Sequence, residues 1–286
     1  MNREAKKTKT IDCQTIVNEV ARLCMDGNYY LGADVVAAFE KGLAEEVSPT
    51  GRDVFKQLIE NANIAKDEQV PMCQDCGVAV VFLEIGQDVR ISGGAIRDAV
   101  TAGVIKGSED GYLRKSMCDP LTRANTGNNA PPIIHTEVVP GDTLKITVAP
   151  KGGGSENMST VAMLPPSAGL EGLKKVVIER VRQAGPNPCP PIVVGVGIGG
   201  NFEYSALLAK KALLREIGEP SPLPDMAALE AELLNDINKL GIGPAGLGGK
   251  VTALWVAIEY HPCHIASFPV AVNINCHAAR HKTVVL

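Results

Sequence analysis

The hydrophobic pattern of the chain changes near Pro71, and this change constrains the fold more than any other feature of the sequence. Upstream of Pro71, apolar residues recur at helical spacing. They are Ile16, Val20, Leu23 and Cys24, and further along Val54, Phe55, Leu58 and Ile59. We therefore expect residues 1–68 to form a helical N-terminal subdomain.

Downstream of Pro71, short apolar runs rich in β-branched residues alternate with helical stretches. The runs typical of strands cover residues 78–85, 133–139, 144–148, 192–196, 251–258 and 268–274. The helical stretches cover residues 95–105, 170–184, 202–217 and 226–240. This alternation predicts a mixed α/β (α+β) body over residues 69–286, which could also join residues 1–68 in one compact domain.

Composition narrows the classes of partner. The 286 residues are 45% hydrophobic with a formal net charge of −4, which is typical of a globular protein and argues against nucleic-acid or anionic-membrane partners. The N-terminal region has no apolar signal-peptide core, and no apolar run approaches the roughly 20 residues that span a bilayer. We therefore expect a cytoplasmic protein whose eight cysteines are reduced, buried or bound to metal.

Three cysteines, Cys73, Cys189 and Cys276, lie in separate loop contexts that suit a metal centre. Their separations of 189 − 73 = 116 and 276 − 189 = 87 residues exclude the compact ferredoxin pattern, so distant loops must converge on one site. A [4Fe–4S] cluster held by three thiolates leaves one iron open to act as a Lewis acid. This pattern predicts a hydro-lyase component rather than an electron carrier.

Other readings of the cysteines stay open. All could be small buried apolar residues, as we expect for Cys13, Cys24 and Cys118. The pair Cys73 and Cys76 also spells C-x-x-C, which occurs in redox disulfides and zinc sites. A strand-like run follows instead of the helix of a redox motif, and the zinc ligands to recruit, His261, Cys263 and His264, lack regular spacing. Both of these readings are weaker than the cluster.

Glycine-rich segments suggest ligand contacts of other kinds. Gly195–Gly200 satisfies G-x-G-x-x-G, so the alternative function is a noncatalytic nucleotide-binding module, although the second parallel strand of such a unit is not evident. Residues 243–252 only superficially resemble a phosphate-binding loop, but Lys250 could still meet an anion. Gly152–Gly154 is either a backbone nest for a carboxylate or a plain turn.

Three polar side chains are candidates for substrate chemistry. Arg114 could hold a carboxylate through two hydrogen bonds, although a surface ion pair is the more common role of a lone arginine. Asp75 and His264 are candidate proton carriers because each lies near a candidate ligand cysteine in the sequence. A structural hydrogen bond is the alternative for either one.

Together these motifs resemble the iron–sulfur (class I) fumarate hydratase family, which includes tartrate dehydratase. The motifs are residues 71–75, 113–114, 125–129, 151–155 and 189–191, and Cys276 with His264 ahead of it. The likeness covers nearly the whole chain and matches the α subunit of the two-subunit form, equivalent to the N-terminal region of the single-chain form. Cys76 departs from the family pattern, where a threonine is usual.

The resemblance implies a set of roles. Cys73, Cys189 and Cys276 would bind the [4Fe–4S] cluster, Gln74, Arg114 and Gly153 would bind substrate, and Asp75 and His264 would be catalytic. The function implied is reversible hydration of fumarate to L-malate, a step of the tricarboxylic acid cycle, with L-tartrate dehydration as the alternative. A β subunit would supply the remaining groups, and the pair would form a homo-oligomer.

Overall fold

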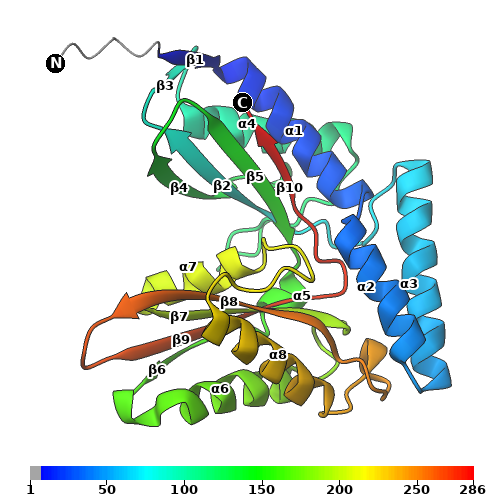
Figure 1. The fold of residues 1–286 in the computed structure, drawn as a ribbon. Helices are drawn as coiled ribbons and strands as arrows, with labels where there is room; N and C mark the ends of the chain where they lie inside the picture. The colour runs from blue at the N-terminus through cyan, green and yellow to red at the C-terminus, as the bar shows by residue number, and fades with distance from the viewer. Residues whose placement is uncertain (1–7) are drawn as a thin grey trace. The chain divides into compact units, whose positions relative to one another are not determined.

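The computed structural model describes residues 8–286, which divide into two compact units (Figure 1). Unit 1 comprises residues 8–31, 64–151 and 280–286, and unit 2 comprises residues 32–63 and 152–279. The helix α3 (Pro49–Glu68) begins in unit 2, and its last turn belongs to unit 1. Each unit has its own sheet and its own hydrophobic core.

Unit 1 contains a four-stranded sheet in the order β10-β5-β2-β4 and a small parallel pair, β1 and β3. Its elements are β1 (Lys9–Asp12), α1 (Cys13–Tyr29), β2 (Val78–Gly86), β3 (Val89–Ser92), α4 (Ile96–Asp110), β4 (Ile133–Val139), β5 (Leu144–Lys151) and β10 (Lys282–Val285). In this sheet β2 runs parallel to β4 and antiparallel to β5, and β10 closes the other edge.

The core of unit 1 lies between its sheet and the helices α1 and α4. Ile16 and Val20 of α1 and Val104 of α4 are fully buried against alternate residues of β2 and β5. Glycine lets the two helices approach closely, because a Cβ at Gly103 would lie 2.6 Å from the Cβ of Val20. The helix α1 begins where the Asp12 carboxylate accepts the Gln14 N–H at 2.8 Å.

Unit 2 contains a four-stranded sheet in the order β6-β9-β7-β8 with helices on both faces. Its elements are α2 (Ala33–Glu45), α5 (Gly153–Glu156), β6 (Thr160–Leu164), the 3₁₀ turn η1 (Pro166–Ala168), α6 (Gly169–Ala184), β7 (Ile192–Gly200), α7 (Phe202–Ala212), α8 (Pro224–Asn238), η2 (Pro244–Gly246), β8 (Ala253–Cys263) and β9 (Phe268–Asn275). Helices α6 and α8 share a core with the sheet, and α7 packs on β7.

The side chain of Glu46 connects the loop after α2 to the glycine-rich segment before β8 by hydrogen bonds. Its carboxylate is buried and accepts backbone N–H groups of Val47, Ser48, Lys250 and Val251 at 2.8–2.9 Å. Burial alone would raise the pKa of Glu46, but these hydrogen bonds outweigh it and lower the pKa. The backbone N–H of Lys250 therefore contacts an anion from within unit 2, the Glu46 carboxylate.

The expected fold class is confirmed, and all six predicted strand regions form strands. The units, however, do not follow the expected division near residue 68, because α1 packs in the core of unit 1 whereas α2 and most of α3 belong to unit 2. Phe39 of α2 and Phe55 of α3 make an edge contact with ring centroids 6.3 Å apart. No helix within residues 8–286 is long and apolar enough to cross a membrane.

Candidate active site

The loop that follows α3 holds four of the predicted site residues together within unit 1. Cys73 Sγ accepts the Asp75 N–H at 3.4 Å and donates to the Gln74 side-chain oxygen at 3.3 Å. Asp75 Oδ1 accepts the Gly77 N–H at 2.9 Å and the Ser116 hydroxyl at 3.4 Å. Arg114 Nη1 donates to the Gln74 carbonyl at 3.4 Å. A thiol, a carboxylate and a guanidinium are thus gathered around one short loop.

Cys73 and Cys76 differ in how deeply they are buried. Cys73 is partly exposed, whereas Cys76 is 4% exposed and belongs to the core of unit 1. The Cys76 sulfur accepts the Arg114 N–H at 3.1 Å, and burial is the main cause that raises the pKa of this thiol. Cys76 therefore packs as a small core residue and orients Arg114, which favours Cys73 as the ligand of this loop.

Arg280 and Asn129 complete this part of unit 1. Asn129 lies in one of the motifs that carry the resemblance, although no role was assigned to it, and Arg280 was not among the predicted site residues. Arg280 is 5% exposed and its Nη2 donates to the Asp75 carbonyl, while Nη1 has no hydrogen-bond partner within the described residues. Asn129 is buried, accepts the Ser116 N–H at 2.8 Å and donates to the Gly77 carbonyl at 3.2 Å. Both residues donate hydrogen bonds to the loop that contains Asp75, although they are distant from it in the sequence.

Cys189 and Cys276 lie close together in unit 2, at one end of its sheet. Cys189 precedes β7 in a turn with φ of 54°, closed by its N–H donating to the Pro186 carbonyl at 3.0 Å. Cys276 follows β9, and the next residue, His277, donates its N–H to the Cys189 carbonyl at 3.4 Å. Nδ1 of His277 lies 3.1 Å from the same oxygen. The antiparallel pairing of β7 with β9 brings these two loops together.

Gly153 begins the single-turn helix α5 and lies at the same end of unit 2. An added Cβ at Gly154 would be 3.6 Å from the carbonyl oxygen of Asn187, two residues before Cys189. Ser159 Oγ, which follows α5, accepts the Ile274 N–H of β9 at 3.3 Å. Residues Gly152–Gly154 form an ordered turn at the start of α5, and none of these glycines has a positive φ.

His264 lies at the other end of the unit 2 sheet. It belongs to the turn between β8 and β9, where its Nδ1 accepts the Ala266 N–H at 3.1 Å. Cys276 follows the opposite end of β9, and a strand of 8 residues is roughly 25 Å long. Within one chain, His264 is therefore remote from Cys189 and Cys276, although sequence proximity suggested otherwise.

The glycines of Gly195–Gly200 do not form a nucleotide loop, which corrects the alternative drawn from them. Gly195 and Gly197 lie inside β7 rather than in a turn between strand and helix, and Gly199 and Gly200 end the strand with positive φ. Val196 and Ile198 between them face the core under α6 and α8. A Cβ at Gly195 or Gly197 would overlap backbone atoms of α7. Glycine is needed here because a helix packs directly on the strand backbone.

The chemistry of the three thiols fits an iron–sulfur cluster. Within residues 8–286 no disulfide forms, and Cys73, Cys189 and Cys276 are all partly or fully exposed. By contrast Cys13 and Cys24 are buried, as expected, and burial raises the pKa of Cys24 to about 12. Cys118 was also expected in the core but is only partly buried. Exposure thus separates the three ligand candidates from Cys13, Cys24 and Cys76, whereas Cys118 and Cys263 share it.

The zinc alternative finds no support in the described chain. Among residues 8–286, no three His, Cys, Asp or Glu side chains are gathered into a possible site for a metal ion, and this applies to Cys73, Cys189 and Cys276 as well as to the zinc candidates. The Cys263 thiol donates to the Ser267 carbonyl at 3.2 Å, and Nδ1 of His261 lies 2.7 Å from the Pro262 carbonyl. These groups therefore make their contacts within the turn that connects β8 and β9.

Comparison with known proteins adds independent information. The sequence matches the family described as fumarate hydratase (Fumerase) over residues 17–285. A putative L(+)-tartrate dehydratase subunit alpha of Methanocaldococcus jannaschii is 46% identical over 271 residues, which cover 93% of this chain and 95% of that protein. The L(+)-tartrate dehydratase subunit alpha of Escherichia coli O157:H7 is 35% identical over 260 residues, covering 88% of this chain and 84% of that protein.

Proposed function

Because the chain belongs to the fumarate hydratase (Fumerase) family, we propose that it is the α subunit of an iron–sulfur hydro-lyase that interconverts fumarate and L-malate. The observation that carries the proposal is the gathering of Cys73, Asp75 and Arg114 around one loop of unit 1. A thiolate ligand, a proton carrier and a carboxylate-binding group are the functions that a dicarboxylate hydro-lyase needs in close proximity.

Each residue of this loop has a distinct task in the proposal. Arg114 binds a substrate carboxylate through its guanidinium, and the Gln74 side-chain amide contacts the same dianion. Asp75 moves the proton, and the bonds from Gly77 and Ser116 to its Oδ1 fix the plane of its carboxylate. In unit 2, the backbone of Gly153 contributes a further contact to the substrate.

The proposed cofactor is a [4Fe–4S] cluster held by the thiolates of Cys73, Cys189 and Cys276. When bound, it supplies an open iron that polarises the hydroxyl group lost or gained in the reaction. The contact between His277 and the Cys189 carbonyl supports this ligand set, because it holds the loops of Cys189 and Cys276 together without metal.

The proposed assembly includes other chains. Two relatives carry the name of an α subunit, which supports a β subunit as the partner of this chain and as the source of further substrate-binding groups. His264 keeps its proposed role as a proton carrier only if it comes from a second copy, since in its own chain it lies at the far end of β9 from Cys276. We place the assembly in the cytoplasm as a homo-oligomer of the α–β pair.

A second candidate function is dehydration of L-tartrate, which the names of the relatives favour. Tartrate differs from malate by one hydroxyl group, and a buried polar partner for that group would discriminate strongly between the two substrates. The groups of this chain that contact the shared carboxylates serve either substrate equally.

The test is steady-state turnover by the chain reconstituted anaerobically with iron, sulfide and its β partner. Malate, fumarate and tartrate are compared by their kcat/KM values, with the Arg114→Lys and Asp75→Asn variants alongside. We expect turnover of malate and fumarate, loss of kcat in Asp75→Asn and a raised KM in Arg114→Lys. Preference for tartrate would select the second candidate, and undiminished kcat in Asp75→Asn would reject the assigned proton carrier.

A further inference from the structure

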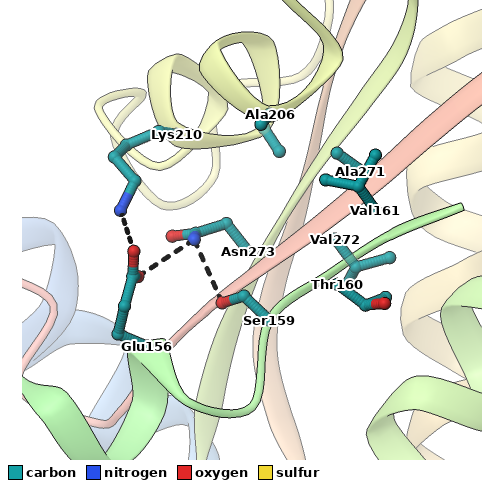
Figure 2. Close-up of a pocket in the computed structure, with 10 residues that line it drawn as sticks. Glu156, Ser159, Thr160, Val161, Ala206, Lys210, Ala271, Val272 and Asn273 are labelled. Carbon is teal, nitrogen blue, oxygen red and sulfur yellow. Dashed lines mark hydrogen bonds and ion pairs between the residues drawn. The ribbon is translucent and has the colours of Figure 1, made fainter. Parts of the chain in front are cut away.

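A cavity of about 280 Å³ in unit 2 lies between α7 and the strands β6 and β9 (Figure 2). One part of its lining is apolar and includes Val161, Ala206 and Ala271. The other part is polar, and there the side chains of Lys210, Glu156 and Asn273 point toward one another (Figure 2). The functions assigned so far make no use of these three residues.

The polar residues form a continuous chain of interactions. Lys210 Nζ of α7 lies 2.6 Å from Glu156 Oε1 at the end of α5. The Asn273 amide of β9 donates to Glu156 Oε2 at 3.1 Å and to Ser159 Oγ at 3.0 Å. Ser159 Oγ also accepts the Ile274 N–H at 3.3 Å. These side-chain interactions therefore connect α7, α5 and β9.

Burial restricts the Asn273 side chain of this arrangement. Asn273 is 6% exposed, and its Oδ1 has no hydrogen-bond partner within the described residues. Its orientation therefore depends on the two bonds donated by Nδ2, to Glu156 and to Ser159. A buried amide that lost these acceptors would leave a further polar group unsatisfied, which costs about 1–3 kcal/mol. The Glu156 carboxylate thus holds Asn273 in one orientation.

The two ends of the network lie next to the residues of the proposed site. Glu156 is the last residue of α5, the turn that begins at Gly153. Asn273 is three residues before Cys276 and lies on the strand that leads to it. The hydrogen bond from Asn273 to Glu156 therefore connects the turn that begins at Gly153 to the strand that leads to Cys276.

We propose that Glu156, held by Lys210, is a positioning residue that fixes the Gly153 turn against the Cys276 end of β9. The role rests on the proposed function, in which Gly153 contacts the substrate and Cys276 is a ligand. Because Glu156 acts through the backbone, its loss should weaken substrate binding more than it slows the chemical step. Iron binding should be unaffected.

The test compares Lys210→Met with a matched control, Lys174→Met. Lys210 is 18% exposed with Nζ 2.6 Å from Glu156, and Lys174 is 16% exposed with Nζ 2.6 Å from Glu232, so these two ion pairs have nearly the same length and burial. Lys174 also lies 3.2 Å from Glu171, so its removal costs at least as much ion pairing as that of Lys210. Lys174 joins α6 to α8. Any general effect of removing a half-buried lysine therefore appears in both variants.

Two measurements are made on each variant and on Glu156→Gln and Glu156→Ala. The first is hydrogen exchange of the amides of residues 153–159 in the isolated chain, and the second is KM and kcat of the reconstituted α–β enzyme. We expect Lys210→Met and Glu156→Ala to exchange about tenfold faster and to raise KM about tenfold with smaller changes in kcat. Glu156→Gln should be milder because it can still accept from Asn273.

The outcomes separate this inference from the function on which it rests. Exchange and KM in Lys210→Met equal to those in Lys174→Met would overturn the positioning role. If the wild-type pair turns over no dicarboxylate, the proposed function fails, and the exchange rates alone then decide whether Glu156 fixes the Gly153 turn. Equal loss of kcat and iron in Glu156→Ala would also contradict positioning.

Discussion

Replacing Glu46 with glutamine should destabilise unit 2 strongly, although the side chain keeps its shape. In the mildest arrangement the new amide group replaces Oε2, and the buried Val251 N–H then loses its acceptor at 2.8 Å. An unsatisfied buried N–H costs about 2 kcal/mol, and each of the three remaining bonds loses about 0.5–1 kcal/mol when the acceptor becomes neutral. We therefore expect a loss of about 4 kcal/mol.

The neighbouring residue supplies the control for this prediction. Glu45 is 47% exposed and its carboxylate lies 4.0 Å from Lys41 Nζ, so Glu45→Gln should change stability by less than about 0.5 kcal/mol. Urea unfolding is followed by selective excitation of Trp255, the only tryptophan of the chain, which lies in β8 of unit 2. Losses within about 1 kcal/mol of each other in the two variants would refute the reasoning.

The pH dependence of the same variant gives a second readout. The pKa of Glu46 is lowered in the folded state by its backbone donors, so the carboxylate stabilises the fold above the ordinary pKa of glutamate. This stabilisation disappears as the pH falls through the lowered pKa. The difference in stability between wild type and Glu46→Gln should therefore shrink on acidification, and a difference that grows would contradict the assignment.

Three further predictions follow from packing and hydrogen bonding. Cys76→Ala should retain full iron binding in an iron assay, because the thiol is a core group, and it should cost about 1–2 kcal/mol in thermal unfolding. Gly197→Ala should cost about 2 kcal/mol or more, because its Cβ would overlap the Ser205 carbonyl, and an unchanged melting temperature would contradict this packing. Arg280→Met should lower kcat/KM about tenfold by releasing the Asp75 carbonyl, and Arg280→Lys should restore part of it; equal values in both variants would refute the specific role of this bond.

The long apolar runs were sufficient to predict the main strands and the α/β class. Runs such as residues 133–139 and 268–274 form strands with nearly the expected bounds. The short strands β1, β3, β6 and β10 were missed because a strand of four or five residues has too little periodicity and exists through its partner. The discontinuous units could not be predicted from the sequence either, because the packing of α1 in unit 1 and of α2 in unit 2 depends on tertiary contacts.

The motifs were sufficient to identify the family, and the match over residues 17–285 confirms that resemblance. The resemblance already favoured Cys73 over Cys76 as the ligand, and the two thiols also differ in burial, which the C-x-x-C spacing does not contain. Gly195–Gly200 satisfied a nucleotide pattern because a strand under a close helix requires the same small residues. The distance of His264 from Cys276 follows from the direction of β9, which twelve residues of sequence separation conceal.

Iron binding by cysteine variants tests the central claim most directly. The chain is reconstituted anaerobically with iron and sulfide, and bound iron and charge-transfer absorption are measured for Cys73→Ser, Cys189→Ser and Cys276→Ser. Cys118→Ser and Cys263→Ser are the controls, since these thiols are also partly or fully exposed. We expect each of the first three substitutions to abolish or sharply reduce the cluster and the controls to retain it. Full iron binding in all three variants, or equal loss in the controls, would contradict the proposed ligand set.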